Sequence, residues 1–133
     1  MPHSRIEQLG DRFKNFENLK SVNLSSSEFL TKIPDLSTAP NIENLYLDHC
    51  TNLVEIHESI GSLIRLVTLD IQFCPNLRIF PSTLHAKYLR KLNFKSCSSL
   101  ARLPNIVVEM KNLTVLCLSG FFQDVSNQNV LEH

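Results

Sequence analysis

Apolar residues recur along this chain at a spacing of 23 or 24 residues. In each unit, one apolar position is followed by two more, three and five residues later. The first of these positions is occupied in turn by Leu19, Ile42, Leu66, Leu89 and Leu113. The later pair reads x-L-x-L-x, in which inward and outward side chains alternate, so each unit is predicted to contain one short strand with its leucines inward.

The complete template is L-x-x-L-x-L-x-x-C-x-x-L-x-x-[IL]-P, and it fits four successive units. This pattern is typical of leucine-rich repeats, whose units bury their apolar sides only by stacking on one another. We therefore predict an α/β solenoid, a leucine-rich-repeat horseshoe fragment. Parallel strands would form its concave face, and loops with short helical or 3₁₀ turns its convex face. Such turns are expected near Ile60 and Leu63, and again near Val107 and Met110.

The template divides the chain into three parts. Residues 1–16 match the tail half of a truncated preceding repeat, residues 17–118 hold four full repeats and a fifth strand, and residues 119–133 form an irregular C-terminal tail. Neither end shows the polar cap that a solenoid needs, so we expect a piece of a longer array or a truncated gene product. Residues 131–133 fit a purification-tag scar and a native tail equally well.

One column of the template follows each strand and is predicted to form an inward structural ladder. Its side chains should bond to backbone groups that the turn leaves unpaired. The members are Ser27, Cys50, Cys74 and Cys97. These cysteines are a repeat length apart and form no C-x-x-C pair, so we expect buried, reduced thiols without metal or disulfides. Cys117 lies between two inward leucines and is expected to point outward as an accessible thiol.

Composition and charge narrow the possible functions. Lys plus Arg equals Asp plus Glu at 13 each, so the chain has no net basic field for nucleic acid or an anionic membrane. No apolar run reaches the roughly 18 residues of a membrane span. The three glycines cannot supply a Gly-rich phosphate loop. Polar residues recur at the repeat spacing without a convergent nucleophile and base, so we predict no enzyme, no metal and no cofactor. His57 is expected to serve a turn.

The outward positions of the strands are the predicted protein-binding surface. Those expected to contact a partner are Glu43, Tyr46, Asp48, His49, Asp70, Gln72, Phe73, Arg90, Lys91 and Lys95. The second repeat is acidic and the fourth is basic, so this face should carry a local dipole, and Tyr46 with Phe73 has the composition of a hot spot. An ordinary solvated surface is the alternative. Reversing Arg90, Lys91 and Lys95 to Glu is expected to leave the fold intact.

Residues outside the leucine ladder carry a resemblance to a known family. The relevant stretches, in chain order, are Ser4–Leu9, Leu19–Ser25, Pro34–Ser37, Leu53–Gly61 and Cys97–Leu100. Together they resemble the leucine-rich-repeat region of plant TIR–nucleotide-binding–leucine-rich-repeat disease resistance proteins, the family of the tobacco mosaic virus resistance type. The resemblance covers roughly residues 4–118.

This resemblance implies a protein-interaction module of an intracellular plant immune receptor. Such a module senses pathogen effectors, holds the receptor inactive, or does both. The implied partner is an effector, a host target or the receptor's own nucleotide-binding domain, with no nucleic acid and no membrane. The implied location is the cytoplasm, with the nucleus as a second compartment.

Two other classes remain open at this point. One is an extracellular leucine-rich-repeat receptor fragment that binds a peptide or protein ligand, and glycans on the sequons at Asn23 and Asn112 would favour it. The other is an enzyme or zinc protein built on a repeat scaffold, which tight zinc stoichiometry would favour.

Overall fold

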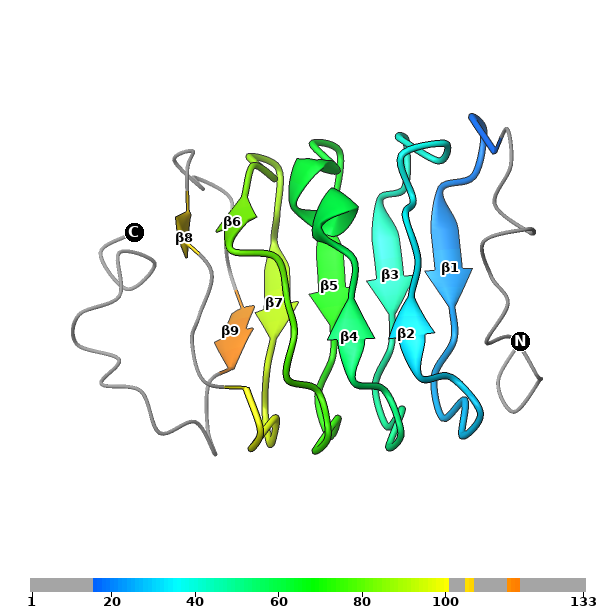
Figure 1. Cartoon of the computed structure of the whole chain (residues 1–133). Coiled ribbons are helices and arrows are strands. Elements are labelled where there is room, and N and C mark those ends of the chain that lie inside the picture. The colour runs from blue at the N-terminus through cyan, green and yellow to red at the C-terminus, as the bar shows by residue number, and fades with distance from the viewer. Residues whose placement is uncertain (1–15, 101–104, 107–114, 118–133) are drawn as a thin grey trace.

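The computed structural model describes residues 16–100, 105–106 and 115–117 of the chain. Its main feature is a parallel sheet of five short strands in the order β1-β3-β5-β7-β9 (Figure 1). The strands are β1 Ser21–Asn23, β3 Asn44–Tyr46, β5 Thr68–Asp70, β7 Lys91–Asn93 and β9 Val115–Cys117. Neighbouring strands are one repeat apart in sequence, so the stacking follows the leucine period.

The register of this sheet places equivalent residues of successive repeats side by side. Val22 is paired with Leu45, Leu45 with Leu69, Leu69 with Leu92, and Leu92 with Leu116. This is the column order that the leucine spacing predicts. Some repeats are 24 residues long and others 23, but the extra residue lies outside the strands. The strand register is therefore the same in every pair.

Very short strands also form on the return path of each repeat. Lys32–Ile33 (β2) pairs in parallel with Glu55–Ile56 (β4), and Thr83–Leu84 (β6) pairs with Asn105–Ile106 (β8). In Figure 1, β2, β4 and β6 run opposite to the strands of the main sheet, because the chain must return before the next repeat begins. The described residues thus form parallel sheets with few helices, which is compatible with the predicted α/β class.

A 3₁₀ helix, η1, spans Glu58–Ser62 on the return path between β4 and β5. It begins at His57, whose Nδ1 accepts a hydrogen bond from the Ser59 backbone N–H at 3.0 Å, so His57 serves the turn as expected. The Ser59 hydroxyl oxygen in turn accepts from the Leu36 N–H at 2.8 Å, which ties the helix to the preceding repeat. Ile60 is fully buried, and the short turn expected around it is present.

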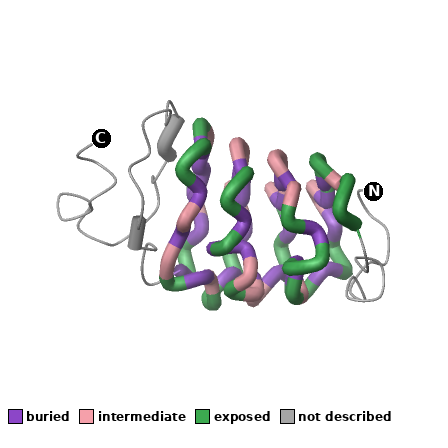
Figure 2. The backbone as a smooth tube through the Cα atoms, turned by 90° about the horizontal axis from the view of Figure 1, so that it is seen from above, coloured by how far each residue is buried: buried purple, intermediate pink, exposed green. Residues whose placement is uncertain are grey.

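The core lies between the main sheet and the return segments, and it runs along the stack (Figure 2). Leu45 and Leu69 enter it from the main sheet, Ile56 enters it from the return strand β4, and all three residues are buried. Full burial of one leucine contributes about 1.5–3 kcal/mol. Each repeat covers the apolar side of the next, so no single repeat would be stable alone.

The structure places the whole ladder column inward. Ser27, Cys50, Cys74 and Cys97 are fully buried, and the three cysteines are free thiols. The expected bonding fails at Ser27, whose Oγ has no hydrogen-bond partner among the described residues. Each thiol donates to a carbonyl oxygen of the preceding repeat, at 3.1, 3.1 and 2.9 Å from the oxygens of Leu24, Leu47 and Ile71. Burial raises the pKa of all three thiols, to about 11 for Cys97, so they stay protonated donors.

The residue before each ladder position has a left-handed backbone. Its φ is 60° at Ser26, 62° at His49, 58° at Phe73 and 61° at Ser96, although none of these residues is glycine. The chain turns sharply here yet keeps its bonds between repeats, since the Phe73 N–H donates to the Lys95 carbonyl at 2.8 Å. The repeat pattern predicts a turn here but not its left-handed backbone, because no glycine marks the position.

Several expectations fall outside the described residues. They concern residues 1–15, Val107, Met110, Asn112, the side chain of Cys117 and the tail from residue 118. In the part of the chain that the structure describes, no helix has the length and apolar character needed to cross a membrane.

Gly61 offers a direct test of how the return path packs. A Cβ atom added there would clash with the carbonyl oxygen of Thr83, while the Gly61 carbonyl accepts the His85 N–H at 2.9 Å. We expect Gly61→Ala to lower the free energy of unfolding by about 1–3 kcal/mol, because a buried clash forces the backbone to shift. Ser62→Ala, an exposed change in the same helix, is the control and should be nearly neutral in urea unfolding. Equal stability of the two variants would contradict this packing.

Candidate functional site

The candidate surface is the outward side of the main sheet together with the turns that end its strands. Because side chains alternate along a strand, Tyr46 faces away from the core while Leu45 is fully buried. The register places Tyr46 beside Asp70, and Asp70 beside Asn93. These outward residues lie next to one another across successive repeats, although 23 or 24 residues separate them in sequence.

Asp70 lies on this face, but it is not an accessible binding group. Its side chain is only 6% exposed. One carboxylate oxygen accepts the backbone N–H of Gln72 and the other accepts the Gln72 side-chain amide, both at 3.2 Å. In the next repeat, the Asn93 side-chain oxygen Oδ1 accepts the backbone N–H of Lys95 at 3.0 Å. Asp70 and Asn93 therefore fix the end of a strand, and Gln72 holds the Asp70 carboxylate through its backbone N–H and its side-chain amide.

The burial of Asp70 also changes the role of Lys91. The Lys91 Nζ lies 3.7 Å from an Asp70 carboxylate oxygen, so this lysine compensates a largely buried charge. Reversing Arg90, Lys91 and Lys95 together was expected to leave the fold intact. Lys91→Glu would instead place a second carboxylate against Asp70, and unpaired buried charge is strongly destabilising. We now expect the triple reversal to destabilise the fold through Lys91.

The aromatic row is the name we give to His49, Phe73 and Lys95, which come from three successive repeats. The rings of His49 and Phe73 are stacked, with centroids 4.8 Å apart and an interplanar angle of 27°. The Lys95 Nζ lies 5.6 Å from the centroid of the Phe73 ring, within the range of a cation–π contact. The row therefore presents a continuous ring surface with a positive charge at one end.

Asp48 connects the aromatic row to the first repeat. Its Oδ1 accepts the Ser25 hydroxyl at 2.6 Å, and its Oδ2 lies 3.1 Å from His49 Nδ1. Partial burial acts to raise the pKa of Asp48, but the hydrogen bonds from Ser25 and His49 outweigh it, so the pKa lies below its usual value. Asp48 is thus ionised at neutral pH and helps to orient the His49 ring.

Phe73 was expected to lie near Tyr46, but the ring that it contacts in the structure is that of His49. Tyr46 lies in the strand beside Asp70, whereas Phe73 lies in the turn, where it contacts His49 and Lys95. The left-handed turn is the reason, because it redirects the residue that follows the strand. A φ of 58° is strained for a bulky residue such as Phe73, and serine occupies the same position at Ser26 and Ser96.

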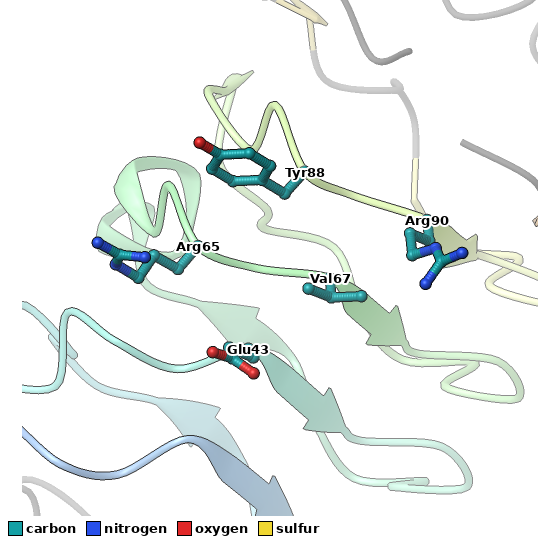
Figure 3. A pocket seen from close by; sticks show the side chains of 5 residues that line it. All are labelled: Glu43, Arg65, Val67, Tyr88 and Arg90. Atoms are coloured by element: carbon teal, nitrogen blue, oxygen red, sulfur yellow. The ribbon is translucent and has the colours of Figure 1, made fainter. Parts of the chain in front are cut away.

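Glu43 and Arg90 lie at the other end of the strands, where the chain enters the sheet. With Arg65, Val67 and Tyr88 they border a shallow pocket of about 400 Å³ (Figure 3). Sequence reasoning did not single out Arg65 or Tyr88 as binding residues. The repeat alignment could have identified them, because Arg65 and Tyr88 occupy the same position in successive repeats. Arg65 lies two positions before Val67, and Tyr88 lies two positions before Arg90.

These groups can recognise a partner through ring faces, hydrogen bonds and charge. Among residues 16–100, 105–106 and 115–117, no group of three His, Cys, Asp or Glu side chains is placed to hold a metal ion. His57, the histidine nearest to η1, uses its Nδ1 to start that helix.

Comparisons with known proteins find that the chain is similar to plant disease resistance proteins. It is 39% identical over 106 residues to disease resistance protein RPP4 and 37% identical over 120 residues to RPP2A, both of Arabidopsis thaliana. It is 35% identical over 109 residues to TMV resistance protein N of Nicotiana glutinosa. These matches cover 80, 90 and 82% of this chain, but the chain spans only 9% of the length of each relative. No protein-family model matches the chain.

The resemblance inferred from the repeat motifs is thereby confirmed. The homologues that match most of this chain are disease resistance proteins of the TIR–nucleotide-binding–leucine-rich-repeat class.

The lowered pKa of Asp48 makes stability depend on pH in a defined direction. A carboxylate with a lower pKa in the folded state stabilises it above the unfolded pKa of about 3.9, and this contribution is lost as the pH falls further. We expect Asp48→Asn to cost about 1 kcal/mol at pH 7 in urea unfolding, and the difference from wild type should shrink below about pH 4. Ser25→Ala should weaken the same pH dependence. A constant difference between Asp48→Asn and wild type from pH 7 to pH 2 would contradict this assignment.

Proposed function

We propose that this chain, a segment homologous to the plant TIR–nucleotide-binding–leucine-rich-repeat disease resistance proteins, is a protein-binding module of an intracellular immune receptor. Homology over most of the chain supports the immune role. The chain would contribute recognition rather than catalysis. Its partner would be a pathogen effector, a host target or the nucleotide-binding domain of the same receptor, and its site of action would be the cytoplasm.

The finer architecture belongs to the same proposal. Constant register in the main sheet and short return strands on the opposite side support a curved solenoid with the main sheet on its concave face. Buried thiols at Cys50, Cys74 and Cys97 suit a reducing compartment, which favours an intracellular module over an extracellular receptor fragment.

The aromatic row is the observation that best supports protein binding. Phe73 adopts a strained backbone conformation where two other repeats use serine, and its ring is stacked on His49 beside the Lys95 ammonium. Strain of this kind costs about 1–3 kcal/mol and is concentrated at functional positions. Rigid aromatic rings beside a cation are also common in the energetic centre of protein interfaces.

A segment exchange tests the proposal. This chain would replace the matching segment of TMV resistance protein N, with residue 73 either unchanged or replaced as Phe73→Ser. Serine suits the turn, as Ser26 and Ser96 show, so the variant should fold and accumulate. We expect Phe73→Ser to change the response of the chimera, either by constitutive cell death or by loss of the response to the virus, as scored in leaves.

Ile79→Ser is the matched control for this exchange. Ile79 is 49% exposed and lies on the return path beside Glu55, away from the main sheet. We expect its chimera to respond like the unchanged segment. If both variants accumulate normally and respond like the unchanged segment, the aromatic row is an ordinary solvated surface and the proposal fails.

A further inference from the structure

The aromatic row ends at His49 with a ring face on which no other ring of the described residues is stacked. The opposite face is stacked on Phe73, which belongs to the following repeat, so the open face points back toward the first repeat. The residue at the equivalent left-handed position there is Ser26, which carries no ring. The His49 side chain remains 50% exposed although Phe73 covers one of its faces. The row therefore offers a partner an open stacking surface.

Asp48 holds a carboxylate beside this open face. Its Oδ1 accepts the Ser25 hydroxyl at 2.6 Å and its Oδ2 lies 3.1 Å from His49 Nδ1, so the carboxylate extends from the ring to the first repeat. That is the direction in which the open face points. The two contacts leave part of the acceptor capacity of an ionised carboxylate unused, and the Asp48 side chain is 22% exposed. A partner can therefore reach the ring face and the negative charge together.

The backbone fixes the separation between these groups. The Ser26 N–H donates to the Asp48 carbonyl at 2.9 Å, and the His49 N–H donates to the Gln72 carbonyl at 2.9 Å, so successive turns are tied to one another. Neighbouring strands lie about 4.8 Å apart. The centroids of the His49 and Phe73 rings are also 4.8 Å apart, so the rings follow the spacing of the repeats. A flat group placed over His49 at the level of Ser26 continues the same stack.

The ring face and the carboxylate together select a planar cation. A guanidinium group is flat, stacks on aromatic faces and donates paired hydrogen bonds to a carboxylate. A lysine ammonium matches the charge but does not stack, whereas an apolar ring stacks but covers the carboxylate without giving it a donor, which is costly. Lys95 does not occupy this position, because it comes from the fourth repeat and lies over Phe73.

We infer that this end of the aromatic row is a site for an arginine side chain of a protein partner. The guanidinium group lies on the open face of His49, at the level of Ser26, and donates to the Asp48 carboxylate. This inference rests on the proposed function as a protein-binding module, and it adds the side chain that the partner must present. His49 contacts the arginine, and Phe73 supports the His49 ring from behind.

The test uses the 133-residue chain and three peptides that differ in one side chain. They are acetyl-Ser-Gly-Arg-Gly-Ser-amide and the same peptide with citrulline or lysine in place of arginine. Citrulline keeps the length and the planar end of arginine but carries no charge. Titration is followed at neutral pH through the ring C–H NMR signals of His49. We expect the arginine peptide to shift these signals and to bind about fivefold more tightly than the citrulline peptide and about threefold more tightly than the lysine peptide.

Ser26→Phe tests where the guanidinium group lies. Phe73 has nearly the same backbone conformation, with a φ of 58° against 60° at Ser26, so this turn accepts phenylalanine and the variant should fold. Its ring would cover the open face of His49, and the affinity for the arginine peptide should fall at least about fivefold. Ser96→Phe is the matched control, because it makes the same change at the equivalent turn on the far side of Phe73. It should leave the affinity unchanged.

Asp48→Asn tests the charge and does not depend on the folding of Ser26→Phe. It should reduce the affinity for the arginine peptide to that for the citrulline peptide, while a well-dispersed backbone spectrum confirms that the variant is folded.

Three results would overturn the inference. They are equal binding of the arginine and citrulline peptides, an equal loss of affinity in Ser26→Phe and Ser96→Phe, and tighter binding of the same peptide with tryptophan in place of arginine. A failed peptide test together with an altered Phe73→Ser chimera would reject the arginine site and leave the proposed function standing.

Discussion

The left-handed turn that follows β1, β3, β5 and β7 is the constraint on which the rest of the described structure depends. One residue takes a φ near 60°, and the next points inward; in three of these four turns it is a cysteine whose thiol bonds to a carbonyl of the preceding repeat. These bonds give each buried thiol an acceptor in the preceding repeat, and a buried polar group without a partner is costly. The turn thereby fixes the spacing between repeats, seals the core and determines which residue is presented to solvent.

The same turn creates the surface that can bind a partner. A residue with positive φ cannot continue the strand, so His49 and Phe73 leave the sheet together and stack across neighbouring repeats. Serine would satisfy the turn with less strain, as it does at Ser26 and Ser96. His49 and Phe73 carry rings at two of the four left-handed positions, where Ser26 and Ser96 carry none, and this contrast supports the proposed role in recognition.

Much of the fold was predictable from sequence, because burial repeats with a period that can be read directly. Leu45 and Leu69 occupy equivalent columns, and the core and sheet register follow from that equivalence. The burial of Asp70 was not predictable, since it depends on the reach of Lys91 and Gln72. A turn after the strand was predicted, but its left-handed backbone at Phe73 was not, because no glycine marks it.

The candidate site could be predicted only in part, because its contacts depend on side chains from neighbouring repeats. Outward columns could be assigned, but a column does not say which of its members touch. The ring contact therefore moved from Tyr46 to His49, and the pocket at Arg65 and Tyr88 emerged only from three repeats seen together.

The central claim is that the Phe73 ring serves recognition, while the backbone around it carries the fold. The most direct measurement is the free energy of unfolding in urea of wild type and Phe73→Ser at neutral pH. Relief of strain should offset the lost ring contacts, so the account predicts a value within about 0.5 kcal/mol of wild type or higher. A loss of more than about 2 kcal/mol would show that the ring is a structural element, and it would contradict the account.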